Sequence, residues 1–468
     1  MENPHNAVDS IDLSTEQQND QNTIQNNVIP INSESQVIND FNKVYTTLVH
    51  GGKNYVLRHN TDAFGHNYLE FFNQKEFIDA HRDSEKLEIQ ITKESGERVT
   101  KLVNPAKYWL ESPESHSSKY GLTFHPVETK FYNGKLNTYM GRGCEPMECE
   151  KSDVEIYLRH VYKIICNGDK NSYEYVIQWL AHLIQKPEEK PEVAIVLKAG
   201  QGTGKGTFVD PIGKIIGSHY LHAQSPEQVI GKFNAQLENK LLVFADEFFA
   251  GSKGSTDRLK TMITERLNTI ERKGQDRISV PCFARIIMAT NHENVIKIER
   301  DERRYLYLEV SEEKKQDRKY FNALHKAIKD PDFPSKLYYY LKNLDISEFE
   351  PRNVPKTDAL TQQKIDNLEP LDKWLYTILL EGGFSINVPW PKRLPNTDIE
   401  QHAEAWLKAH DLKVWGDIPR KVGNLMTKLG APRKRGRDGQ NLIYYRELPS
   451  LDDIRDNFSQ YINADFEW

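Results

Sequence analysis

Three short apolar runs in the middle of the chain each end in polar residues. The runs are rich in β-branched side chains and cover residues 193–197, 241–245 and 284–290. Runs of this length and composition predict buried β-strands. A glycine-rich turn follows the first run, Asp246 and Glu247 follow the second, and Asn291 follows the third. The pattern predicts an α/β core over residues 191–345.

Apolar residues at helical spacing precede this core. Two stripes with a period near that of an α-helix lie within residues 151–190, and Pro187 and Pro191 end the second one. The pattern predicts a pair of helices directly before the first strand. We interpret the pair as a helical collar that joins subunits, or as a lid. The alternative, that it packs against its own core, stays open.

Polar and mixed sequence fills the amino-terminal part. Residues 1–40 are rich in Asn, Gln, Ser, Asp and Glu and contain no aromatic residue, which indicates a disordered leader. Residues 41–150 contain strand-like stretches, including 44–49 and 55–57 around a turn signal, and predict a small α+β accessory domain. No catalytic constellation stands out in this domain.

The last part of the chain, residues 346–468, alternates helical stripes with a basic segment. Three helical stretches precede a basic turn over 433–440 and a strand over 442–445. This order suggests a winged-helix-like domain, with a plain packing module as the alternative. The expected DNA-binding residues of the basic turn are Arg433, Lys434, Arg435 and Arg437. The final residues 463–468 are acidic with two aromatics and form either a docking tail or a frayed end.

Composition narrows the class of protein. The chain has 468 residues, a formal net charge of −6 and four cysteines. This is typical of a globular protein with reduced thiols in a cytosol-like compartment, so we expect a cytoplasmic protein. No apolar run reaches the roughly 18 residues of a membrane span, and no secretory signal is recognisable. With a negative net charge, any contact with nucleic acid is expected to be local.

The turn after the first strand has the layout of a phosphate-binding loop. Its small residues let backbone N–H groups surround a phosphate, a helix begins behind them, and a lysine reaches the β- and γ-phosphates. The pattern departs from the usual one at Ala199 and at Gly206, which leaves the contact of Thr207 to Mg²⁺ open. The expected ATP-binding residues are Gly200, Gln201, Gly202, Thr203, Gly204, Lys205, Gly206 and Thr207.

Polar residues at the ends of the second and third strands fit the hydrolysis of ATP. Asp246 is expected to hold Mg²⁺, and Glu247 to polarise the attacking water. Asn291 is expected to sense the γ-phosphate. Arg303 and Arg304 follow, and a guanidinium delivered by a neighbouring subunit suits the transition-state charge on a γ-phosphate.

A basic hairpin is predicted between the second and third strands. Two strand-like arms over residues 269–280 flank Lys273 and Gly274. In a ring, such tips would point into the central channel and grip a phosphate backbone. The alternative is a solvated hairpin without this role.

Together these motifs resemble a superfamily 3 DNA helicase, specifically the helicase part of phage, plasmid and poxvirus-type primase-helicases. The likeness covers residues 150–345 well. It implies an AAA+-like core, a homohexameric ring, 3′-to-5′ movement on single-stranded DNA, and Lys273 as the DNA-contacting hairpin residue. It also implies the roles given above for Asp246, Glu247, Asn291 and Arg304. No primase motif is found, so priming would need a separate primase or polymerase.

The sequence therefore predicts an ATP-dependent DNA helicase that uses ATP and Mg²⁺ and acts on single-stranded and forked duplex DNA. Two alternatives stay open. One is a DNA-binding ATPase that remodels or loads without unwinding. The other is an adenylate-kinase-like phosphotransferase, which the ending Gly204-Lys205-Gly206-Thr207 also resembles.

Overall fold

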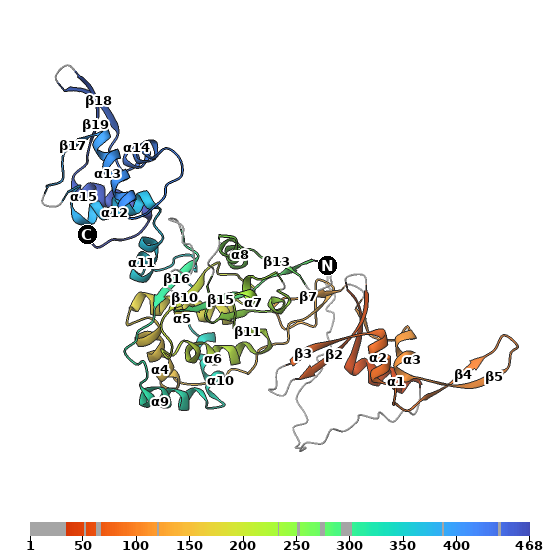
Figure 1. Cartoon of the computed structure of the whole chain (residues 1–468). Helices are drawn as coiled ribbons and strands as arrows, with labels where there is room; N and C mark the ends of the chain where they lie inside the picture. Colours follow the sequence, from red (N-terminus) through yellow and green to blue (C-terminus); the bar gives the residue numbers. More distant parts are fainter. Residues whose placement is uncertain are drawn as a thin grey trace, which may run out of the picture. The chain divides into compact units, whose positions relative to one another are not determined.

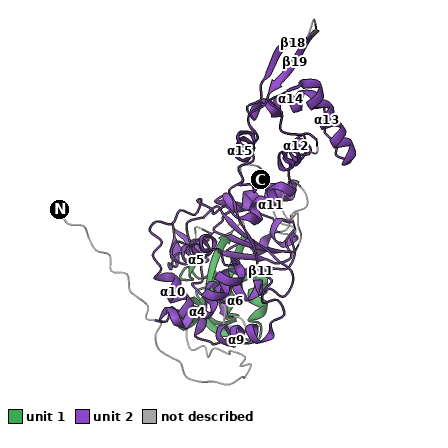
Figure 2. Cartoon of the chain, turned by 90° about the vertical axis from the view of Figure 1, so that its left-hand side faces the viewer, with its two compact units in different colours: residues 1–59, 70–119 green, residues 60–69, 120–468 purple. Residues whose placement is uncertain are grey.

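The computed structural model describes residues 34–50, 53–61, 67–118, 121–232, 234–249, 253–271, 277–291, 302–385, 388–438 and 441–468. The chain is a mixed α/β protein (Figure 1). Its described residues form two compact units, one within 1–59 and 70–119 and the other within 60–69 and 120–468 (Figure 2). No helix of the described part is long and apolar enough to cross a membrane.

The first unit combines a small sheet with three helices. The sheet has the strand order β3-β2-β1-β6, and β1 and β2 form the hairpin that the sequence predicted. The elements are α1 (Glu34–Val44), β1 (Tyr45–His50), β2 (Lys53–Thr61), β3 (Asn67–Asn73), α2 (Gln74–Ala80), β4 (Leu87–Thr92), β5 (Arg98–Val103), α3 (Pro105–Glu111) and β6 (Ser117–Ser118). Phe41, Phe77 and Trp109 are buried at its centre.

The first unit begins earlier in the chain than the sequence suggested. Helix α1 starts at Glu34, so residues 34–40 do not belong to a leader. Val37 and Ile38 face the core with Phe41, because these three positions share one side of the helix. The polar composition around them concealed this short stripe. Residues 1–33, which we expected to be disordered, lie outside the described part of the chain.

A five-stranded parallel sheet forms the centre of the second unit. Its strands are β10 (Ala194–Lys198), β11 (Tyr220–Ala223), β12 (Leu242–Ala245), β15 (Arg285–Thr290) and β16 (Tyr305–Glu309). The order is β11-β12-β15-β10-β16, with every pairing parallel. The three predicted strands correspond to β10, β12 and β15, whereas β11 and β16 were not predicted. Because the strands are parallel, their carboxyl ends meet at one edge of the sheet.

Helices cover both faces of this sheet. Ile195 and Leu197 of β10 belong to one hydrophobic cluster, and Ala194 and Val196 belong to another on the opposite face. The helices at the first cluster are α4 (Lys151–His160), a π-helical turn (Val161–Ile165), α5 (Lys170–Gln185), α6 (Lys205–Ile216), α9 (Arg318–Ile328) and α10 (Phe333–Lys342). The helices at the second are α7 (Glu227–Ile230), α8 (Lys253–Thr264) and α11 (Asp358–Asp366).

The predicted helical pair of residues 151–190 is part of this core. Val154 and Trp179, on α4 and α5, are fully buried in the same cluster as the sheet. The structure thus has the packing alternative, and a role of these helices in joining subunits stays a prediction. The apolar stripes predicted the helices correctly, but an amphipathic pattern does not determine which part of the protein packs against the apolar face.

Residues 121–150 belong to the second unit and not to an accessory domain that extends to residue 150. They form three short strands: β7 (Leu122–Thr123), β8 (Phe131–Tyr132) and β9 (Lys135–Asn137). Phe124 is buried in the main core, and the backbone N–H of Met140 donates to Nε2 of His219 at 2.9 Å. These contacts join residues 121–150 to parts of the second unit that are distant in the sequence. Composition alone does not predict such contacts.

The carboxyl-terminal elements enclose a hydrophobic cluster of their own, which starts at Leu371. They are α12 (Pro370–Glu381), β17 (Arg393–Pro395), α13 (Asn396–Ala409), α14 (Ile418–Lys428), β18 (Arg433–Asp438), β19 (Asn441–Glu447) and α15 (Leu451–Ile462). Residues before this cluster join the main core, because Leu360 of α11 packs there and the Thr357 hydroxyl donates to the Tyr307 carbonyl. The boundary therefore lies later than the predicted residue 346.

Two expectations for this last part change. The basic segment is not a turn, since Arg433–Asp438 form strand β18, which pairs with β19. The terminal aromatic residues are also engaged. The ring centres of Phe466 and Trp468 lie 5.6 and 6.0 Å from that of Phe458, so both rings pack onto their own domain. These contacts correct the expectation of a free docking tail or frayed end.

Candidate functional site

The glycine-rich loop connects β10 to α6. Gly202 and Gly204 have φ angles of +78° and +93°, a region that side chains with a Cβ rarely adopt. A Cβ on Gly204 would lie 2.6 Å from Cε1 of His160, so the position also lacks space for one. The loop then enters α6 at Lys205, which places the first backbone N–H groups of the helix at the turn.

Strand order brings the other predicted residues to this loop. Strand β15 lies between β10 and β12, so Asn291 after β15 stands between the loop and Asp246 after β12. A cavity of about 280 Å³ forms there. Its lining residues are Gln201, Gly202, Thr203, Gly204, Lys205, Gly206, Thr207, Asp246, Glu247, Thr290 and Asn291. Of the expected loop residues only Gly200 is not in the lining.

Lys205 folds back on the loop. Its Nζ donates to the carbonyl oxygens of Ala199 and Gly200 at 2.9 and 3.2 Å. Burial lowers the pKa of this lysine, and the charges of Asp246 and Glu247 act in the opposite direction. A half-buried cation that contacts only carbonyl oxygens gains free energy when an anion replaces them.

The carboxylates at the end of β12 are held in a strained turn. Glu247 has a φ of +51°, which is uncommon for a residue other than glycine. Its backbone N–H donates to Oδ1 of Asp246 at 3.0 Å. Such strain is concentrated at functional sites, where the surrounding structure over-determines the conformation. Both carboxylates line the cavity beside Lys205.

A histidine that the sequence pattern did not indicate contacts the glycine-rich loop. His160 of α4 lies 3.2 Å from the Gly204 carbonyl through Nε2 and 2.9 Å from the Tyr320 hydroxyl through Nδ1. Burial lowers the pKa of His160 to about 4, so the ring is neutral at pH 7. In the tautomer that satisfies both contacts, Nε2–H donates to Gly204 and the Tyr320 hydroxyl donates to Nδ1.

Thr207 has a partner of its own. Its hydroxyl lies 3.1 Å from Nε2 of His325 on α9, within hydrogen-bond distance. The hydroxyl oxygen keeps a lone pair and still lines the cavity. Nothing in the sequence spacing pointed to His160 or His325, because both come from helices far from the loop in the chain.

The structure does not bring the two arginines to this cavity. They directly precede β16, which runs parallel to β10 with Ala194 opposite Tyr305. The loop follows the other end of β10. Five residues at about 3.3 Å each separate the two edges of the sheet by about 16 Å. This is longer than an arginine side chain, so Arg303 and Arg304 do not reach the cavity of their own chain.

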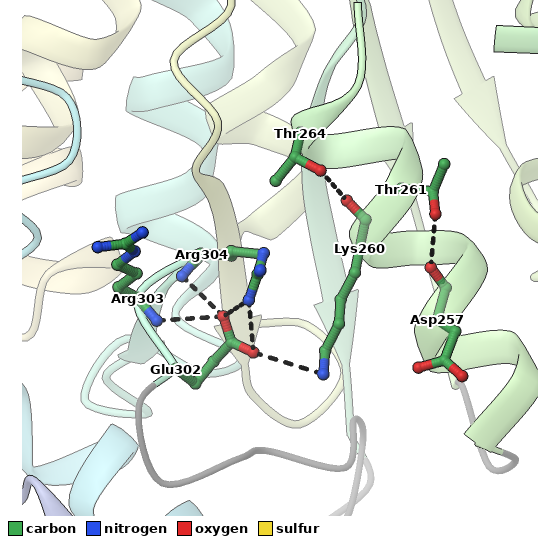
Figure 3. Close-up of polar contacts among 7 residues, drawn as sticks. All are labelled: Asp257, Lys260, Thr261, Thr264, Glu302, Arg303 and Arg304. Carbon is green, nitrogen blue, oxygen red and sulfur yellow. Dashed lines mark hydrogen bonds and ion pairs between the residues drawn. The ribbon is translucent and has the colours of Figure 1, made fainter. Parts of the chain in front are cut away.

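A buried carboxylate distinguishes the two arginines (Figure 3). The Glu302 side chain is 0% exposed and accepts from the backbone N–H groups of Arg303 and Arg304 at 3.1 and 2.9 Å. It also binds Nη1 of Arg304 at 3.2 Å and lies 3.9 Å from Nζ of Lys260 on α8. The guanidinium of Arg303 points away from this cluster and is exposed (Figure 3).

The two arms of the predicted hairpin are present. Strands β13 (Leu267–Ile270) and β14 (Ile278–Pro281) pair antiparallel. Lys273 and Gly274 lie outside the described residues. Helix α8, which carries Lys260, leads directly into β13.

The four basic residues of β18 do not share one face. Arg433, Arg435 and Arg437 alternate with Lys434, so only the arginines lie on the same side of the strand. The guanidinium of Arg433 lies 3.7 Å from the ring centre of Tyr444. Lys434 forms an ion pair with Glu447. The cations of this strand that form no ion pair with another described residue are therefore the three arginines.

The chain is similar in sequence to known proteins. The fold and the cavity define a mixed α/β protein that gathers a glycine-rich loop, a lysine, two carboxylates and an amide at one edge of a parallel sheet. A sequence model of a family of unknown function, DUF5906, matches residues 197–304. The DNA primase-polymerase of Nitratiruptor phage NrS-1 is 33% identical over 147 residues, which are 31% of this chain and 20% of that protein.

Solved structures of the NrS-1 C-terminal region extend the likeness to most of the chain. One apo structure has a TM-score of 0.65 at 17% identity and covers 88% of this chain and 99% of that one. A second, of residues 305–718, has a TM-score of 0.62 at 17% identity and covers 90% and 100%. The chain is thus homologous to part of a phage DNA primase-polymerase and shares the fold of the NrS-1 C-terminal region.

Proposed function

We propose that this chain is an ATP-dependent DNA helicase of superfamily 3, which works as a hexameric ring in the replication of a phage, plasmid or other mobile element. The observation that carries the proposal is the convergence of loop amides, Lys205, Asp246, Glu247 and Asn291 on one cavity. Homology to a phage DNA primase-polymerase supports a role in DNA replication in the cytoplasm of a host cell.

In this proposal the loop binds the phosphates of ATP. The first N–H groups of α6 and the loop amides donate to phosphate oxygens, and the positive end of the helix adds attraction. Lys205 exchanges the carbonyls of Ala199 and Gly200 for the β- and γ-phosphates. The small residues at 202 and 204 fit this role, because they let the backbone approach the phosphates.

Hydrolysis uses the residues at the strand ends. Water attacks the γ-phosphorus, its proton passes to the Glu247 carboxylate, and the bond to the bridging β–γ oxygen breaks. Asn291 donates its amide to a γ-phosphate oxygen. Asp246 and the Thr207 hydroxyl would hold Mg²⁺, which neutralises charge on the phosphates.

A neighbouring subunit supplies the last cation. The resemblance implied Arg304 for this role. We assign it to Arg303 instead, because Arg304 is bound to Glu302 while the guanidinium of Arg303 is exposed. Arg303 lies one strand length from the cavity of its own chain. From there its side chain can enter the cavity of the next subunit of a ring. A guanidinium there stabilises the charge of the transition state.

DNA contacts arise at two places in this proposal. The hairpin tip with Lys273 grips single-stranded DNA in the channel of an AAA+-like ring. The arginines of β18 and helix α14 form a winged-helix-like surface for duplex DNA at the fork. Priming would be left to a separate primase or polymerase.

Two other functions use the same motifs. A remodelling or loading ATPase would hydrolyse ATP on DNA without separating strands. An adenylate-kinase-like phosphotransferase would leave Asp246, Glu247 and Asn291 without a role, although all three line the cavity. The geometry therefore favours hydrolysis over phosphate transfer.

A strand-displacement assay tests the proposal. We expect the wild type to release a labelled strand from a fork with a single-stranded 3′ tail, only with ATP and Mg²⁺, and not from a substrate with a 5′ tail alone. Glu247→Gln should bind ATP and DNA but release no strand. DNA-dependent hydrolysis without a released strand would favour the remodelling ATPase, and phosphate found on a nucleoside monophosphate would favour the phosphotransferase.

A further inference from the structure

A concave site in the carboxyl-terminal part of the second unit is not used by the proposed function. It has a volume of about 380 Å³ and lies between α12, α14 and the connection that precedes α14. Lys413 and Trp415 come from that connection, and Lys421 and Lys428 come from α14. The remaining lining residues are Glu369, Pro370, Leu371, Asp372, Val414, Asn424, Leu425 and Tyr461.

Trp415 is unusually exposed. Its relative exposure is 88%, the highest among the large apolar side chains of the described residues. No hydrogen bond or ring contact of Trp415 is found within the described part of the chain, so both faces of the indole are available. An indole left in water forgoes the stabilisation of burial, which contact with a flat ligand would restore.

The surroundings of Trp415 are predominantly cationic. Lys413 and Lys421 are exposed and form no ion pair with another described residue. Nζ of Lys428 lies 5.7 Å from the ring centre of Tyr461. Of the two acidic residues in the lining, Asp372 is only 3% exposed and its carboxylate lies 3.4 Å from the Tyr461 hydroxyl, whereas Glu369 is exposed. The accessible rim carries three exposed lysines and one exposed glutamate, so its net positive charge attracts anions.

We propose that this site binds single-stranded DNA, with an unpaired base stacked on Trp415 and neighbouring phosphates on Lys413, Lys421 and Lys428. Aromatic platforms within a positively charged groove are the usual solution for single-stranded nucleic acid. A protein partner is disfavoured, because the cores of protein interfaces are depleted of lysine. The exposed amide of Asn424 is available to the edge of the stacked base.

This site is distinct from the ATP cavity and from the arginines of β18. It rests on the proposed function only in naming DNA as the ligand. Binding without nucleotide therefore tests it independently of hydrolysis. A chain that binds the strand through Trp415 but hydrolyses no ATP would support this site and contradict the helicase.

The experiment compares two labelled strands of equal length and charge, oligo(dT) and a strand with abasic positions, bound to the full chain without nucleotide. Trp415→Ala should weaken oligo(dT) binding about 5- to 150-fold, the effect of losing one stacked base. Trp415→Phe should retain most of the affinity, since it keeps an aromatic face. Leu380→Ala, which truncates another exposed apolar side chain, should change nothing.

The abasic strand separates stacking from charge. It should bind the wild type more weakly than oligo(dT) does, and Trp415→Ala should not weaken it further. Lys421→Gln should weaken both strands alike and reduce the salt dependence of binding by about one charge. Oligo(dT) affinity unchanged in Trp415→Ala, or an equal loss for both strands, would overturn the proposal.

Discussion

At the scale of single residues, the loop glycines have different roles. Gly204 combines a φ of +93° with a neighbour at 2.6 Å from any Cβ, whereas a Cβ on Gly206 meets nothing within 4 Å. The departure from the usual loop pattern at Gly206 is therefore not imposed by lack of space. The hydroxyl that the usual pattern has at position 206 is found here on Thr207, within hydrogen-bond distance of His325.

Substitutions at these two glycines should have opposite effects. Gly204→Ala should lower the free energy of unfolding by about 1–2 kcal/mol from the backbone alone, and by more because His160 must move. Gly206→Ser should be neutral or stabilising by about 0.5 kcal/mol, since it lies within a helix. Thermal unfolding of both variants checks this. Equal losses for the two would contradict the geometry described for the loop.

At the scale of elements, the central strands and the flanking helices could be predicted, but their neighbours could not. The apolar runs at β10, β12 and β15 are continuous and end in polar residues, so the strands and the residues that line the cavity could be predicted from the sequence. Strands β11 and β16 are less distinct, and their places depend on pairing between distant segments. The supports His160, His325 and Glu302 act through tertiary contacts, which spacing along the chain does not encode.

Helix α4 is tied to the loop through a histidine that must stay neutral. Burial lowers the pKa of His160 to about 4, below its ordinary value of 6.5, so the unfolded chain binds more protons between these pH values. The free energy of unfolding should then fall as the pH drops from 6.5 to 4, by up to about 3 kcal/mol from this group. Burial also lowers the pKa of His219 to about 4, which adds to the effect.

Urea unfolding at several pH values measures this linkage. His160→Gln keeps an amide donor for the Gly204 carbonyl but cannot be protonated, so its stability should depend less on pH than that of the wild type. If the free energy of unfolding of His160→Gln depends on pH as strongly as that of the wild type, the His160 ring is not the group that titrates.

At the scale of the whole molecule, the active site is proposed to form between copies of the chain. The loop and Arg303 lie at opposite edges of one sheet, so an active interface joins the loop of one subunit to the arginine of the next. Lys205→Ala and Arg303→Ala should each be inactive alone. Mixed one to one, they should regain activity at about a quarter of the interfaces, where both intact elements meet.

A second mixture controls this experiment. Lys205→Ala and Glu247→Gln both damage the same cavity, so their mixture contains no intact site and should stay inactive. Recovery of activity in this control, or none in the first mixture, would contradict the assignment of Arg303 to the neighbouring subunit.

The central claim is that this cavity hydrolyses ATP to drive movement on DNA. The most direct measurement is the rate of ATP hydrolysis with and without single-stranded DNA, for the wild type, Lys205→Ala and the control Lys214→Ala on the same helix. We predict hydrolysis stimulated by DNA in the wild type and in the control, and lost in Lys205→Ala. Hydrolysis indifferent to DNA, or unaffected by the loss of Lys205, would contradict the account.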